Sequence, residues 1–141
     1  MASDTLKGLI RRFEGLRLKA YLCPAGVWTC GLGSTGPDVF KGTVWTEAYA
    51  EARMERDADV FELGTKRLCM SLEGDALAAI ADFSYNLGLT RLAGSTLRRK
   101  LNRGDIEGAR RELGRWVRGG GKILNGLVIR RSVEAALLKG D

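Results

Sequence analysis

Residues 13–33, FEGLRLKAYLCPAGVWTCGLG, constrain the fold more than any other stretch of the chain. A helical pattern ends on Glu14. Apolar and polar residues then alternate over 16–21, which is typical of a strand. Residues 24–26, Pro-Ala-Gly, predict a turn, and 27–32 predict the returning strand. We therefore expect a carboxyl group at a helix end, facing a hairpin that carries a thiol and a hydroxyl group.

The rest of the chain predicts helices around this hairpin. A first helix is expected over residues 4–13, where apolar side chains recur at helical spacing after the capping candidates of 3–5. A third short strand is expected over 39–44. Further helices are expected over 48–63, with Gly64 as the end, and over 76–85, 97–101, 106–117 and 126–138, with a flexible break at 119–121.

This order of elements places the protein in the α+β class. We expect a small three-stranded antiparallel sheet lobe over about 14–45. A larger helical lobe is expected over about 46–141, joined by the N-terminal helix 4–13, with a cleft between the lobes. The 141 residues, 45% of them apolar, suit a single domain over 1–141.

Composition excludes several kinds of site. The chain has no histidine, which removes Ser-His-Asp triads, Cys-His proteolysis and zinc sites that contain histidine. Three cysteines are too few for a four-thiolate zinc site, so we expect no metal and no cofactor. A reducing compartment is expected during synthesis. A Cys23–Cys30 bridge across the turn is geometrically conceivable but disfavoured.

The net charge of +6 favours acidic partners: nucleic acid, an anionic lipid surface or an acidic polymer such as peptidoglycan. The arginine pairs, at 98–99, 110–111 and 130–131, are dispersed along helices, so solvated faces are the better interpretation and nucleic acid is not expected as a partner. No stretch has the length of a membrane span, and the N-terminus lacks the pattern of a signal peptide. A target beyond the membrane would therefore require a helper for release.

Three residues in the opening stretch could carry chemistry. Glu14 could act as a general acid if apolar neighbours, Tyr21 among them, kept its carboxyl group protonated. Cys23 precedes the turn, and Thr29 lies within the returning strand. Taken one at a time, each has an ordinary structural explanation: a solvated helix end, a buried thiol and a β-branched strand residue.

Together, Glu14, Cys23 and Thr29, within the frame A-Y-x-C-P-x-G-x-W-T-x-G, resemble the motif of the phage-type lysozymes, the endolysin muramidases. Later segments match that family in order and cover nearly the whole chain. They are Asp82-Phe83-Ser84-Tyr85-Asn86-Leu87-Gly88, Ser95-Thr96-Leu97 with Leu101-Asn102 and Gly104-Asp105, Arg115-Trp116-Val117, Gly120-Gly121-Lys122, and Gly126-Leu127-Val128-x-Arg130-Arg131-x-x-Glu134.

The resemblance implies a lysozyme-like fold and a peptidoglycan-degrading endolysin that hydrolyses the β-1,4 bond between N-acetylmuramic acid and N-acetylglucosamine. Glu14 would be the general acid, with Cys23 and Thr29 placing the water. Asn86 and Tyr21 would contact substrate, and Arg130 or Arg131 would reach Glu14 from the last helix and add to the binding site.

We expect a monomer that acts on bacterial peptidoglycan without inserting stably into a membrane. It would stay in the host cytoplasm until a holin-like helper releases it to the periplasm and wall.

Several positions depart from the family pattern. Cys23 stands where aspartate is commoner, and Leu32 and Ser34 replace an aromatic residue and a histidine. With Glu14 as the single certain carboxyl group, a lytic transglycosylase remains an alternative, because one acid suffices when the sugar's own 6-hydroxyl attacks. A catalytically degenerate peptidoglycan-binding module is the other alternative.

Overall fold

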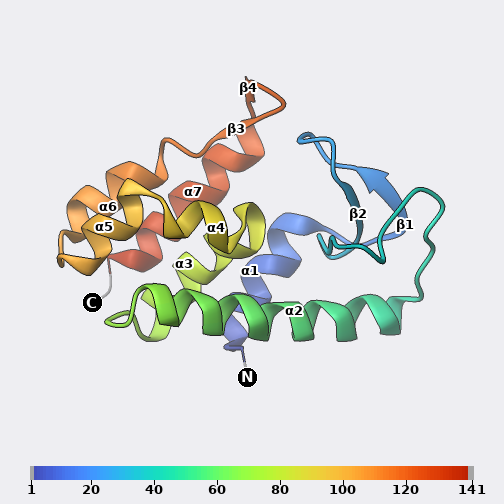
Figure 1. The fold of residues 1–141 in the computed structure, drawn as a ribbon, viewed down its shortest axis with the longest axis horizontal. Coiled ribbons are helices and arrows are strands. Elements are labelled where there is room, and N and C mark those ends of the chain that lie inside the picture. Colours follow the sequence, from blue (N-terminus) through green and yellow to red (C-terminus); the bar gives the residue numbers. More distant parts are fainter. Residues whose placement is uncertain (1, 140–141) are drawn as a thin grey trace.

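The computed structural model describes residues 2–139. Figure 1 shows the β1–β2 hairpin at one end of the molecule and helices α5 and α6 at the other, with α2 running along one side. The elements are α1 Asp4–Glu14, β1 Arg17–Leu22, β2 Trp28–Gly31, α2 Glu47–Leu68, α3 Gly74–Leu87, α4 Leu89–Ala93, α5 Thr96–Asn102, α6 Ile106–Leu113, β3 Arg118–Gly119, β4 Lys122–Ile123 and α7 Asn125–Leu138.

Helix α1 forms as the sequence predicts and ends on Glu14. The Ser3 hydroxyl oxygen accepts a hydrogen bond from the Leu6 N–H and caps the first turn. Leu6 and Ile10 bury the apolar face of the helix. Gly15 follows with a φ of 68°, which stops the helix directly after Glu14.

The sheet of the small lobe has two strands, not the three expected. Strands β1 and β2 pair antiparallel, with Tyr21 opposite Thr29. In the segment expected as a third strand, Val44 makes only an isolated bridge to Lys19. The segment folds into a turn instead, closed by the Thr43 N–H on the Phe40 carbonyl at 3.0 Å, so it cannot run extended beside β1.

Helix α2 is longer than expected because Gly64 does not end it. The Thr46 hydroxyl oxygen caps its start as predicted, by accepting from the Tyr49 N–H. The helix then continues to Leu68. A Cβ atom at position 64 would lie 2.5 Å from Leu89 Cδ1, so this glycine allows α4 to approach α2 closely.

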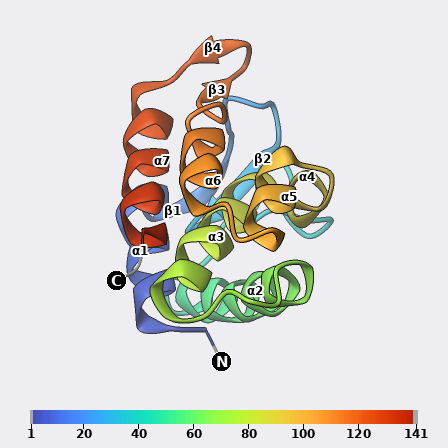
Figure 2. The same ribbon diagram turned by 90° about the vertical axis from the view of Figure 1, so that its left-hand side faces the viewer.

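Helix α3 is the core element, as its apolar sequence predicts, and it contributes to two clusters of buried side chains. Ala78, Ala81 and Tyr85 pack with α1 and α2. Ile80 and Phe83 pack on the other side with α4–α7. Helices α6 and α7 lie side by side over this second cluster (Figure 2). A third, smaller cluster under the hairpin contains Ala20, Cys30 and Val39.

The C-terminal third differs from expectation at three places. Helix α4 was not predicted, because it is one short turn after Gly88. Helix α6 ends at Leu113 rather than at 117. Residues 118–123 form the antiparallel hairpin β3–β4 rather than a flexible break (Figure 2). Across residues 2–139, the helices lack the combination of length and apolar composition that a transmembrane span needs.

Candidate active site

Glu14 lies at the C-terminal end of α1, against the backbone that follows β2. Its side chain is only 15% exposed. A Cβ atom at Gly33 would lie 2.5 Å from the Glu14 carboxyl carbon and Oε1, and Gly33 has a φ of 80°. Position 33 therefore requires glycine for both space and backbone conformation.

Arg130 of α7 holds the Glu14 carboxylate. Its Nη1 donates to Glu14 Oε2 at 2.6 Å, while Nε and Nη2 donate to the two oxygens of Asp82 at 2.8 Å each. Arg130 and Asp82 are 3% and 0% exposed. The sequence left open which of two arginines reaches Glu14; in the structure it is Arg130.

Arg131, the next residue of α7, does not reach Glu14 but binds Asn86 and Glu134, which with Arg130 and Asp82 form one buried polar cluster. Its Nη2 donates to Asn86 Oδ1 at 2.8 Å and to Glu134 Oε2 at 3.0 Å. Its guanidinium carbon lies 5.2 Å from the centre of the Phe83 ring. Asn86 is thus joined to the arginines of α7, with its side-chain oxygen already bonded. Arg131 is 1% exposed, which suits holding α7 to α3 better than touching a polymer.

The pKa values of the two fully buried carboxyl groups, Asp82 and Glu134, are shifted in opposite directions. Burial would raise the pKa of Asp82, but the hydrogen bonds from Arg130 outweigh it and hold that pKa below its usual value. Burial raises the pKa of Glu134 well above its usual value, and a hydrogen bond to Asp82 adds to the rise. These shifts favour the carboxylate at Asp82, the counter-ion of Arg130, and the neutral acid at Glu134.

The hairpin brings Cys23 and Thr29 to one carbonyl group. The Val27 carbonyl accepts the Cys23 N–H at 3.0 Å and the Thr29 hydroxyl at 2.9 Å. Cys23 is partly exposed and its thiol is free, whereas Thr29 is buried. Tyr21 lies opposite Thr29, and burial together with the charge of Glu14 raises the Tyr21 pKa.

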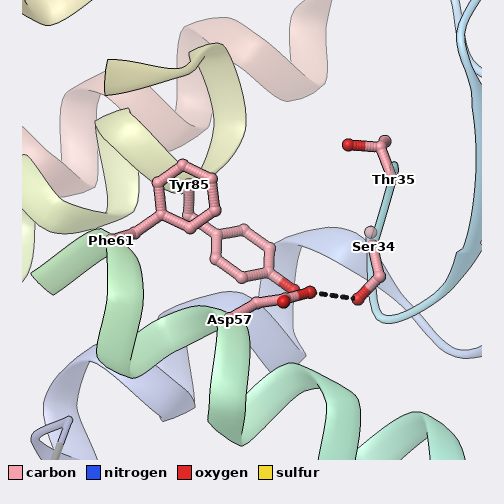
Figure 3. Close-up of a pocket in the computed structure, with 6 residues that line it drawn as sticks. Ser34, Thr35, Asp57, Phe61 and Tyr85 are labelled. Carbon is pink, nitrogen blue, oxygen red and sulfur yellow. Dashed lines mark hydrogen bonds between the residues drawn. The ribbon is translucent and has the colours of Figure 1, made fainter. Parts of the chain in front are cut away.

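A polar pocket of about 230 Å³ opens beside Gly33. Figure 3 shows the Ser34 hydroxyl donating to Asp57 of α2 at 2.9 Å. The Tyr85 hydroxyl donates to the Leu32 carbonyl at 2.7 Å. The two positions that depart from the family pattern, Leu32 and Ser34, are therefore tied to α3 and α2 by these bonds. The pocket is lined by Gly33, Ser34, Thr35, Asp57, Phe61 and Tyr85 (Figure 3).

The hairpin turn also contacts the helical lobe. A Cβ atom at Gly120 would lie 2.9 Å from the Pro24 carbonyl oxygen, so β3–β4 touches the turn that carries Cys23. This contact was not expected, since the sequence suggested only flexibility there.

Two acidic residues of the site were missed as functional candidates. Asp57 gives no signal within the polar sequence of α2. Asp82 does, because a carboxylate inside the most apolar helix needs a partner. Among residues 2–139, the structure groups no three histidine, cysteine, aspartate or glutamate side chains as metal ligands.

Comparison with known proteins shows to which family the chain belongs. The family model described as phage lysozyme matches residues 11–134. The chain belongs to the phage lysozyme family. It is 42% identical over 136 residues to an endolysin of Acyrthosiphon pisum secondary endosymbiont phage 1, covering 93% of this chain and 92% of the relative.

Other relatives agree with this family assignment. A SAR-endolysin of Bacteriophage PS119 is 38% identical over 122 residues, with 86% and 73% of the two chains covered. The solved muramidase domain of SpmX from Asticcacaulis excentricus superposes with a TM-score of 0.85 at 26% identity, over 100% of this chain and 99% of that one. This phage lysozyme has the lysozyme-like α+β fold and is a peptidoglycan-degrading glycoside hydrolase.

Proposed function

We propose that this lysozyme cleaves the β-1,4 bond between N-acetylmuramic acid and N-acetylglucosamine, with Glu14 as the general acid. The observation that carries this proposal is the Glu14 carboxyl group, partly buried at a helix end, held by Arg130 and in contact with Gly33. A positioned acid is needed because the leaving sugar oxygen must gain a proton as its bond to the anomeric carbon breaks.

Thr29 and Cys23 suit the placing of the water. The Thr29 hydroxyl donates its own proton to Val27, so toward a water molecule it acts as an acceptor. A water that donates to Thr29 keeps its lone pairs free for attack on the anomeric carbon. Cys23, anchored on the same carbonyl, would help to place this water.

In this role Glu14 donates a proton to the leaving sugar oxygen, and bound sugar excludes water from the site. Tyr21 and Asn86 remain our candidates for substrate contacts. Arg130 and Arg131, both buried, would act on the substrate through Glu14 and α3 rather than by direct contact.

The central test is Glu14→Gln, which keeps the side-chain volume and removes the acid. We expect no clearing of a cell-wall suspension, with circular dichroism and melting temperature like those of the unaltered protein. Glu51→Gln is the matched control, because Glu51 of α2 also pairs with an arginine, Arg11, at 3.0 Å, but this ion pair is exposed to solvent. Full clearing by Glu14→Gln would reject the assignment. Wall binding with no release of reducing ends by the unaltered protein would instead identify a degenerate binding module.

A lytic transglycosylase is the second candidate, favoured by one observation. Position 23 carries a thiol where the family commonly carries a second carboxyl group, so Glu14 could act alone and the 6-hydroxyl of muramic acid could replace water. Mass spectrometry of the products decides, because the 1,6-anhydro product is lighter by one water than the hydrolysed one. We expect the heavier, hydrolysed product.

We propose further that the protein is monomeric, acts without nucleic acid or a metal, and reaches the wall from the host cytoplasm through a holin-like helper. Expression in a bacterial host with and without a holin tests this. We expect lysis only with the holin, and lysis without it would remove the helper from the proposal.

A further inference from the structure

The guanidinium group of Arg130 is fixed on three sides. Two of its nitrogens bind both oxygens of Asp82, and the third, Nη1, binds Glu14. Because a guanidinium is planar and rigid, a two-point attachment sets its plane and with it the direction of the third nitrogen. The place of Nη1, and so of the carboxyl group it holds, therefore depends on Asp82.

Asp82 also changes what happens when Glu14 gains a proton. Arg130 is 3% exposed, and a buried cation without a counter-charge is costly. With Asp82 present, Arg130 keeps an ionic partner after Glu14 becomes neutral. Without Asp82, a neutral Glu14 would leave the Arg130 charge largely unpaired, so the ionised form of Glu14 would persist to lower pH.

We propose that Asp82 is a positioning residue for the reaction, which orients Arg130 and keeps that buried cation paired while Glu14 gives up and regains its proton. The inference rests on the proposed role of Glu14 as the general acid. Asp82 itself touches neither Glu14 nor the surface: its two oxygens bind Arg130, and it is fully buried.

Four other ionisable groups lie around Glu14 and Arg130. Tyr21 of β1 and Tyr85 of α3 sense the charge of Glu14, and Arg131 and Glu134 lie on α7. Glu134 is fully buried in the same cluster and hydrogen-bonds to Asp82, but its ion pair is with Arg131, at 2.8 Å, and it lies 4.0 Å from Arg130 Nε. It therefore provides a matched comparison for the loss of a buried carboxyl group.

The experiment records kcat and KM against pH for Asp82→Asn and Glu134→Gln on soluble peptidoglycan fragments. For Asp82→Asn we expect the basic limb of the kcat profile to move to lower pH by roughly one unit, with about a tenfold loss of kcat at neutral pH. KM should stay within about twofold, because Asp82 lies below the surface. For Glu134→Gln the basic limb should stay in place.

Two results would overturn the inference: an unshifted basic limb in Asp82→Asn, or equal shifts in both variants, which would indicate a general effect of losing a buried carboxyl group. Glu14→Gln separates this inference from the proposed function. If Glu14→Gln remains active, the acid assignment fails; if it is inactive while Asp82→Asn keeps the unaltered profile, only the role of Asp82 fails. Should Asp82→Asn not fold, Asp82→Glu retains the charge and must keep the basic limb at its original pH.

Discussion

The absence of a side chain at Gly33 makes space for the carboxyl group of Glu14, which we propose as the general acid. The Glu14 carboxyl group occupies the space where any other residue would carry its Cβ atom. Gly33→Ala should therefore displace Glu14 and lower activity by at least about tenfold. Backbone strain at its positive φ should also cost about 1–2 kcal/mol of unfolding free energy. Wall-clearing rates and chemical denaturation measure the two effects.

Gly26→Ala is the control for this change. Gly26 has nearly the same φ, 79°, but a Cβ atom there would have nothing within 4 Å. It should show a similar loss of stability with activity largely kept. Equal losses of activity in both variants would show that strain in the hairpin, rather than contact with Glu14, explains the effect.

The Thr29 hydroxyl offers a second test at this scale. Thr29→Val keeps the shape and the β-branch but removes the acceptor that we assign to the water, so activity should fall by roughly 10²-fold. Thr29→Ser retains the hydroxyl and should recover most of that loss. A Thr29→Val enzyme as active as Thr29→Ser would show that Thr29 only packs in β2.

At the scale of elements, the β3–β4 hairpin supports the turn that carries Cys23. Gly120→Ala would place a Cβ atom 2.9 Å from the Pro24 carbonyl oxygen and should push the two hairpins apart. We expect a several-fold fall in kcat/KM. Gly121→Ala, with a positive φ but an open surrounding, should leave kcat/KM near its original value. Similar kinetics for both variants would show that the contact does not position Cys23.

The elements also show what a sequence can and cannot predict. Helix α1 and the β1–β2 hairpin follow from period and turn residues within their own segments, and both were predicted. The predicted third strand does not form, because a local turn at Phe40–Thr43 competes with pairing to β1. The predicted end of α2 at Gly64 was wrong. Gly64 is small because Leu89, far away in the sequence, packs against it, and no local sequence pattern reveals this contact.

The site follows the same rule. The family motif identified Glu14, Cys23 and Thr29, and the resemblance pointed to the arginines of α7. The choice of Arg130 over Arg131 could not be made, because neighbours on one helix point about 100° apart and only the packing of α7 on α3 decides which one faces Glu14. The role of Asp82 needs the same long-range information.

For the whole molecule, the buried carboxyl groups determine how stability depends on pH. Glu134 has a raised pKa in the folded state, so between its usual and its raised value the folded protein holds a proton that the unfolded chain lacks. Stability from this group is complete below about pH 4.5 and is lost as pH rises through the folded value. Glu134→Gln should therefore gain stability relative to the unaltered protein as pH rises, by up to about 1.4 kcal/mol per unit.

Thermal unfolding of both proteins at several pH values between 4 and 8 measures this difference. The slope matters rather than the offset, because loss of the Arg131 partner lowers the variant's stability at every pH. The pKa of Asp82 is shifted the other way: its contribution is present above about pH 4 and is lost only as pH falls through its depressed folded value. Parallel curves for the two proteins would show that Glu134 is not protonated in the fold.

Because α3 supplies side chains to the clusters on both of its faces, neither cluster can separate from the other without losing this helix. Its amide hydrogens should consequently exchange with solvent only through complete unfolding, while those of the β3–β4 hairpin exchange through local openings. Asp82 lies within α3. Asp82, which orients Arg130 beside the proposed acid, is thus part of the last segment to open. The protein should therefore keep an assembled site until the whole fold is lost.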